Sequence, residues 1–247
     1  MTIAMVFNKS GNMGKSTLTQ YGFKPRMNNA VVIPMETINS HDHGGDVDNI
    51  KGSQLGDLLQ ALALMENAIV DVGSSNASAL LTMLNQYDGA HENFDYFIVP
   101  VIPKTKQIRD TISTIDALAE IGVPASKIRV IFNMIEDVDT NLEKEFAPLV
   151  EYHRVEGRFV LNYDAVVYQQ DFFIQIANTG ETVESILADT TDYSALLKAA
   201  TDDNEKVRIA KRRGLGYLAR SVKKNLDIAV AAVFSEPQYA TSKKMKG

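Results

Sequence analysis

The chain has 247 residues, of which 45% are apolar and 23% are charged, and its formal net charge is −6. A chain of this length can bury a substantial core, and its apolar fraction excludes an intrinsically disordered protein. The absence of cysteine excludes disulfides, iron–sulfur clusters and cysteine-ligated zinc sites. Because no apolar run approaches the length of a membrane span and the N-terminus lacks a secretory signal, we expect a cytoplasmic protein.

Short apolar runs alternate with helical patterns up to about residue 180, and the pattern after Gly180 is helical only. Strands are predicted at Ile3–Phe7, Ala30–Met35, Ala68–Val72, Tyr96–Ile102 and Ile128–Asn133, with a weaker candidate at Arg158–Leu161. Helices are predicted after the first strand, ending at Gly22 and Pro25, and over Asn76–Tyr87 and Lys106–Ile121. Continuous apolar runs are typical of strands buried on both faces. The order therefore predicts an α/β fold with a mainly parallel sheet and helices on both faces.

The segment after the first strand, residues 8–17, reads NKSGNMGKST and is called the phosphate loop below. A glycine-rich turn between a strand and a helix presents backbone N–H groups to a polyphosphate. Lys15 supplies a cation for the β- and γ-phosphates, and Ser16 can place its hydroxyl on Mg²⁺. The sequence therefore predicts a P-loop NTPase fold that binds ATP or ADP with Mg²⁺. The predicted binding residues are Ser10, Gly11, Asn12, Met13, Gly14, Lys15, Ser16 and Thr17.

The usual P-loop pattern requires glycine where this chain has Lys9. The loop instead resembles the deviant form K-G-G-x-G-K-[ST] of the ParA/MinD family of ATPases. In that family a signature lysine before the first glycine contacts the nucleotide of the partner subunit. Ser10 occupies the signature position here, and Asn12 replaces the second glycine. Either Lys9 takes the signature role from a shifted backbone, or the role is absent.

Further segments resemble plasmid-stability StbB proteins, which are ParA/MinD-like ATPases encoded beside plasmid transfer and stabilisation genes. The similar segments are 24–27, 35–39, 69–76, 94–100 and 190–193. The resemblance implies a switch ATPase in plasmid stability, segregation or conjugative transfer. It also implies a nucleotide-dependent homodimer and a plasmid-encoded DNA-binding partner protein.

Other residues complete the predicted site. Asp71 ends an apolar strand, where a carboxylate that organises Mg²⁺ belongs, and Gly73 can donate its backbone N–H to the γ-phosphate. The resemblance implies an acidic residue after the second strand that orients the attacking water. Glu36 is nearest that position and Asp42 is the alternative, with weak or partner-dependent hydrolysis as a third possibility. The resemblance also assigns the amide of Asn133 to adenine, and capping of the following turn is the alternative.

The stretch Thr37–Gln54 is polar and glycine-interrupted, and we expect it to differ between the ATP and ADP states. His41-Asp42-His43 with Asp46 and Asp48 also allows a transition-metal site. Mg²⁺ with ATP already accounts for acidic residues in this stretch.

Eight basic residues and no acidic residue lie between Lys206 and Lys224, which leaves a charge of −14 on the rest of the chain. The eight are Lys206, Arg208, Lys211, Arg212, Arg213, Arg220, Lys223 and Lys224. Apolar residues recur at helical spacing through the same segment, at Leu215, Leu218, Val222, Leu226, Ala229 and Val233. This pattern predicts an amphipathic helix that binds an anionic membrane, DNA or a protein partner. A helix packed on its own domain is the alternative.

We therefore expect a P-loop ATPase domain over 1–200, a basic helical segment over 201–234 and a flexible tail over 235–247. The segment 206–234 is predicted to be detachable from the ATPase domain. A membrane or protein partner is favoured over DNA, because the apolar stripe would make no contact with the backbone of a DNA duplex. Such a protein would lie peripherally at the inner membrane or the nucleoid. A nucleotide-binding adaptor with little hydrolysis, acting through its basic helix, is the rival function, and a small-molecule kinase or ligase is a third.

Overall fold

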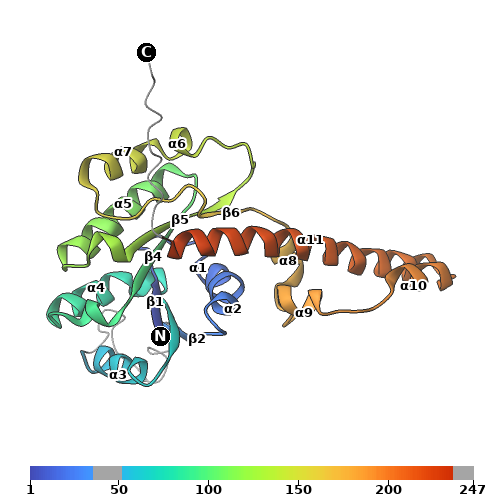
Figure 1. The fold of residues 1–247 in the computed structure, drawn as a ribbon, viewed down its shortest axis with the longest axis horizontal. Coiled ribbons are helices and arrows are strands. Elements are labelled where there is room, and N and C mark those ends of the chain that lie inside the picture. Colours follow the sequence, from blue (N-terminus) through green and yellow to red (C-terminus); the bar gives the residue numbers. More distant parts are fainter. Residues whose placement is uncertain (36–51, 236–247) are drawn as a thin grey trace, which may run out of the picture.

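A six-stranded parallel sheet forms the centre of the computed structural model, which describes residues 1–35 and 52–235 (Figure 1). The strand order is β2-β3-β1-β4-β5-β6, and every pairing is parallel. The strands are β1 Thr2–Val6, β2 Val31–Pro34, β3 Asn67–Asp71, β4 Tyr96–Val101, β5 Ile128–Ile135 and β6 Val166–Tyr168. The α/β fold predicted from the apolar runs is confirmed, and five of the six strands lie where they were predicted.

Helices cover both faces of the sheet. The α-helices are α1 Lys15–Thr17, α2 Lys24–Arg26, α3 Gly52–Leu62, α4 Ala77–Gln86, α5 Thr105–Glu120, α6 Leu142–Glu145, α7 Ala147–Glu156, α8 Phe172–Ile176, α9 Val183–Leu187, α10 Tyr193–Ala199 and α11 Asp203–Phe234. Successive side chains of β1 point to opposite faces, with Ile3 and Met5 in one apolar cluster and Ala4 and Val6 in the other. Helices α3, α4, α5 and α7 pack on the first cluster, and α8, α9 and α11 pack on the second. None of the helices in the described part of the chain is long and apolar enough to span a membrane.

The helical run after the phosphate loop does not stop at Gly22 and Pro25 as predicted. It continues through the π-helical turn η1, Leu18–Phe23, into α2 and ends at Arg26. Pro25 lacks the N–H that would bond the carbonyl of Tyr21. The Nη1 of Arg26 donates to the carbonyls of Tyr21 and Gly22, at 3.1 and 3.0 Å, and supplies the missing donor.

The weaker strand candidate Arg158–Leu161 is wrong. Only an isolated bridge between Val160 and Arg129 forms there, and the edge strand is the three-residue β6. The side chain of Asn225 on α11 takes the place of a further strand. Its Oδ1 accepts from the N–H of Tyr168 at 3.1 Å, and its Nδ2 donates to the carbonyl of Val166 at 2.7 Å.

Helix α11 confirms the predicted amphipathic helix, but its apolar stripe faces the protein's own core. Leu226 and Val233 are 1% and 2% exposed, and both belong to the apolar cluster on the second face of the sheet. Arg26 also pairs with Asp227 at 2.7 Å. The expectation of a detachable segment over 206–234 stays a prediction. The burial of α11 argues against it, because removing the segment would strip that cluster of its largest covering helix.

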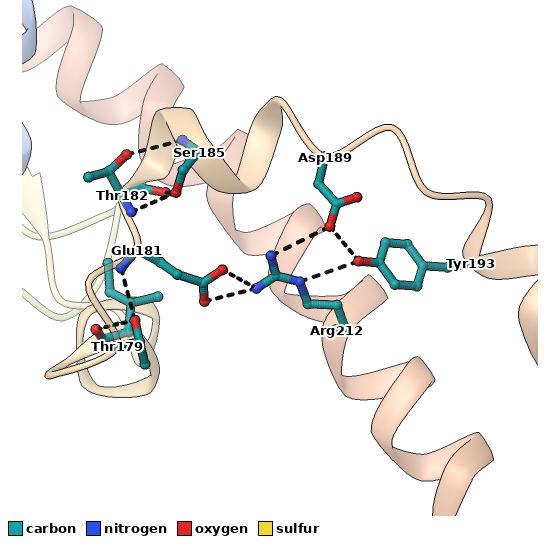
Figure 2. A network of polar contacts seen from close by, with 8 residues as sticks. Thr179, Glu181, Thr182, Ser185, Asp189, Tyr193 and Arg212 are labelled. Atoms are coloured by element: carbon teal, nitrogen blue, oxygen red, sulfur yellow. Dashed lines mark hydrogen bonds and ion pairs between the residues drawn. The ribbon is translucent and has the colours of Figure 1, made fainter.

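The N-terminal half of α11 extends beyond the sheet beside α10 (Figure 1). Arg212 fastens the preceding chain to it through Glu181 at 2.7 Å, Asp189 at 3.5 Å and the hydroxyl of Tyr193 at 3.3 Å (Figure 2). Hydrogen bonds from the side chains of Thr191 and Tyr193 lower the pKa of Asp189. The carboxylate therefore supports this network above its ordinary pKa, and its contribution is lost only as the pH falls through the lowered value.

Substitutions on the two sides of α11 test whether the helix belongs to the core. Leu226→Ala is expected to lower the free energy of unfolding by about 2–4 kcal/mol, because it leaves a cavity under α11. Val207→Ala on the same helix, where the valine is 53% exposed, should change it by less than about 0.5 kcal/mol. Urea unfolding of both variants measures the difference, and an effect of Leu226→Ala as small as that of Val207→Ala would show that this side of α11 is not part of the core.

Candidate functional site

A cavity of about 530 Å³ lies at the carboxyl ends of β1 and β3. Its lining residues are Gly11, Asn12, Met13, Gly14, Lys15, Ser16, Thr17, Pro34, Asp71, Gly73, Ser74 and Met134. The structure thus brings together the phosphate loop, the carboxylate at the end of β3 and the Gly73 turn, as the sequence predicts. Ligands of open α/β sheets bind at this edge, because the strand ends leave the loops free to shape a site.

The backbone of the phosphate loop turns through two left-handed residues. Asn12 has φ 56°, a conformation that asparagine tolerates better than most residues, so it can replace the glycine of the resembled pattern. Gly14 has φ 72°, and a Cβ at this position would lie 2.5 Å from the Nδ2 of Asn133. Asparagine is therefore accepted at the first position, whereas the second requires glycine.

Lys15 opens α1 and is only 8% exposed. Its ammonium donates to the carbonyls of Ser10 at 3.0 Å and Asn8 at 3.5 Å. A cation held in a loop that also begins a helix presents positive charge and backbone N–H groups to the same cavity. This donor set fits the phosphates of a nucleotide.

The predicted Mg²⁺ residues share this cavity. The hydroxyl residue Ser16 and the carboxylate Asp71, which is 9% exposed, both line it. The turn after β3 lies against the loop, because a Cβ on Gly11 would lie 3.3 Å from the Oγ of Ser74. Ser16 and Asp71 supply the hard oxygen donors that Mg²⁺ prefers, and a nucleotide-bound Mg²⁺ needs few of them from the protein.

The structure places two other predicted residues differently. Lys9 points away from the lining, and its Nζ donates to the carbonyl and hydroxyl of Ser113 on α5, at 3.1 and 3.3 Å. Asn133 is 5% exposed and donates from Nδ2 to the carbonyl of Met13 at 2.8 Å. The amide predicted to contact adenine therefore holds the phosphate loop, and its contact with adenine stays a prediction.

The predicted water-orienting residues Glu36 and Asp42 lie outside the described residues. The proposed metal ligands His41, His43, Asp46 and Asp48 lie there too. Within residues 1–35 and 52–235 no group of three or more metal-ligating side chains occurs.

One contributing residue, Asn8, was missed by sequence reasoning. It follows β1, is 0% exposed, and its Oδ1 accepts from the N–H of Ser10 at 2.8 Å while its Nδ2 donates to the carbonyl of Pro100 at 2.9 Å. An amide directly after a run of buried apolar residues is the signal that points to it, since buried amides need fixed partners.

No protein-family model matches the chain, and no curated protein matches it significantly. Solved structures do match. MinD in the MinC:MinD cell division protein complex of Aquifex aeolicus is 14% identical, covers 74% of this chain and 87% of its own, and has a TM-score of 0.50. The structure of pNOB8 ParA is 11% identical, covers 92% of this chain and 98% of its own, and also has a TM-score of 0.50. The chain has the ParA/MinD P-loop NTPase fold. At these identities the likeness concerns the fold alone.

Within this ParA/MinD fold, a Gly14→Ala variant tests the close approach of Asn133 to the phosphate loop. The variant is expected to lose about 2–4 kcal/mol of unfolding free energy, from left-handed strain and from the clash with the amide. Gly89→Ala is the matched control, because Gly89 has φ 80° and nothing within 4 Å of an added Cβ, so only the strain of about 1–2 kcal/mol remains.

Combining Gly14→Ala with Asn133→Ala should recover part of the loss in thermal unfolding. If the losses of stability in the two single variants add in full in the double variant, the clash with Asn133 does not cause the loss in Gly14→Ala.

Proposed function

We propose that the protein is a Mg²⁺-dependent ATPase of the ParA/MinD type, acting as a switch in plasmid stability, segregation or conjugative transfer. The observation that carries this proposal is the buried ammonium of Lys15, placed by a strand–loop–helix turn in one cavity with Ser16 and Asp71. The fold shared with MinD and ParA supports the class, and the resemblance to StbB proteins supports the plasmid role.

Each residue has a distinct task in this proposal. Lys15 and the loop amides hold the β- and γ-phosphates and offset their charge. Ser16 ligates Mg²⁺ and Asp71 orients its coordination shell, while Gly73 donates its N–H toward the γ-phosphate. Mg²⁺ with ATP, when bound, supplies a phosphoryl group for in-line attack by water. Glu36, or Asp42 in its place, orients that water.

A nucleotide-binding adaptor with little intrinsic hydrolysis is the second candidate. The contact of Lys9 with Ser113 favours it, because a signature lysine held on α5 does not reach across to another nucleotide. Phosphate release measured alone and with candidate partners separates the two functions. A rate at background under every condition identifies the adaptor.

ATP is proposed to gate a homodimer that works with a plasmid-encoded DNA-binding protein. The MinD structure is that of a complex with MinC, which supports a partner protein for this fold. Molecular mass measured with ATP, with ADP and without nucleotide tests the dimer. A mass that does not change between these states contradicts gating.

The outer face of α11 is proposed to bind the phosphates of DNA, which places the protein at the nucleoid. Of the eight basic residues of α11, Lys206, Arg212 and Lys223 form ion pairs with residues that the structure describes. Arg213, Arg220 and Lys224 are exposed, form no ion pair with any residue that the structure describes, and follow one another at i, i+7 and i+11 along one side of the helix. The apolar stripe that favoured a membrane is buried, so a phosphate backbone suits the remaining basic face better.

Lys15→Ala is expected to weaken binding of Mg²⁺ with ATP by at least about 100-fold while leaving the fold intact, because it removes a charge-assisted phosphate contact. Lys144→Ala on α6 is the matched control, and it should bind nucleotide as the wild type does, since Lys144 is exposed and does not line the cavity. Equilibrium binding of a fluorescent ATP analogue measures both. Wild-type affinity in Lys15→Ala would rule out this site.

The triple variant Arg213→Gln, Arg220→Gln and Lys224→Gln should weaken binding to duplex DNA. The slope of the affinity against salt should also fall by about 0.9 for each phosphate that the variant no longer neutralises. Lys223→Gln is the control, because that ammonium already pairs with Asp227 at 2.7 Å. Gel shifts at several salt concentrations measure the slope, and co-sedimentation with anionic vesicles runs in parallel. Binding to vesicles but not to DNA would assign this face to a membrane.

A further inference from the structure

Two buried threonine hydroxyls on α5 face the start of the phosphate loop. Thr111 and Thr114 are each 0% exposed, although they lie within a helix that carries polar residues on its other side. Their hydroxyls donate to carbonyls of their own helix, at 2.8 Å to Gln107 and 2.7 Å to Asp110. Each hydroxyl has one proton, so these bonds leave the oxygen of each threonine free to accept.

The phosphate loop supplies the donors. The Nδ2 of Asn8 donates to the Oγ1 of Thr111 at 2.9 Å, and the backbone N–H of Lys9 donates to the Oγ1 of Thr114 at 3.2 Å. The carbonyl of Pro100 and the N–H of Ser10 fix which atom of the Asn8 amide is oxygen and which is nitrogen, because each partner has a single role. We call this set of contacts between Asn8, Lys9, Thr111 and Thr114 the junction. It holds two consecutive N–H groups of the loop, those of Lys9 and Ser10.

The same backbone segment carries the carbonyls that hold the ammonium of the phosphate site. Lys15 donates to the carbonyl of Asn8, which shares a peptide group with the N–H of Lys9, and to the carbonyl of Ser10, whose own N–H is bonded to the Asn8 side chain. A shift of these carbonyls moves the cation relative to the cavity. The position of Lys15 thus depends on hydrogen bonds that end on α5.

We infer that Asn8, Thr111 and Thr114 are positioning residues for the phosphate loop, and that they couple its geometry to α5. The inference rests on the proposed nucleotide binding at this site. None of the three residues lines the cavity. They hold the loop in the conformation that directs Lys15 toward the β- and γ-phosphates, so that a displacement of α5 changes nucleotide affinity.

Thr111→Val and Thr114→Val test the inference in the full chain, because they remove a hydroxyl and keep the shape of the side chain. Each is expected to weaken binding of a fluorescent ATP analogue with Mg²⁺ about fivefold to tenfold, the effect of losing one hydrogen bond. Thr111→Ser and Thr114→Ser keep the hydroxyl and should restore the affinity to within about twofold. A residue that only stabilises the fold would shift the unfolding midpoint without this rescue pattern in affinity.

Thr82→Val on α4 is the matched control. Its hydroxyl also donates to a carbonyl of its own helix, that of Ser78 at 3.1 Å, but it is exposed and does not line the cavity. The control should bind the analogue as the wild type does. Folded Thr111→Val and Thr114→Val proteins that also bind with wild-type affinity would overturn the inference.

Hydrogen exchange provides a test that needs no variant. In the nucleotide-free protein the amide of Ser10, bonded to a buried carboxamide, should exchange slowly although it belongs to a loop. Rapid exchange of this amide would overturn the inference whether or not the valine variants fold. A wild-type protein that shows a slow Ser10 amide but binds no ATP would instead refute the proposed function and leave the junction standing.

Discussion

The burial of one ammonium group, that of Lys15, governs the construction of this end of the sheet. A buried cation is costly unless polar groups surround it. Here the carbonyls of Asn8 and Ser10 surround it, and they can do so only while the loop keeps its sharp turn. This sharp turn requires the left-handed conformations of Asn12 and Gly14. The backbone conformation of the loop and the position of the charge in the site therefore depend on each other.

Two buried asparagines hold the loop at two separate points. Asn8 connects it to β4 and α5, and Asn133 connects it to the end of β5 through the carbonyl of Met13. A buried amide that lost its partners would be destabilising by about 1–3 kcal/mol, so each asparagine locks the loop to its neighbours. A loop held in this way needs little reorganisation when it binds an anion, which is the physical basis of preorganised electrostatic stabilisation.

The parts of the structure that the sequence predicts are those with local causes. Five strands follow from apolar runs, and the phosphate loop follows from its spacing of glycine, lysine and serine. The parts that escaped prediction depend on contacts across the chain. The strand β6 is paired on its outer side by Asn225, about 60 residues later, and the helical run passes Pro25 because the side chain of Arg26 supplies donors. Periodicity showed that α11 has an apolar side, but it could not show that this side packs on the sheet.

The packing of α11 connects the two surfaces for which functions are proposed. The helical run that begins at the phosphate loop passes under α11, where a Cβ on Gly22 would lie 3.8 Å from Leu226. Arg26, at the end of that run, pairs with Asp227 at 2.7 Å and donates to the carbonyl of Lys223 at 3.3 Å. Lys223 stands beside the exposed basic row of α11. The phosphate loop and the basic face are thus connected in the structure through one helical run, its packing on Leu226 and one ion pair. The segment that its charge marked as separate is therefore packed directly on the helical run that starts at the phosphate loop.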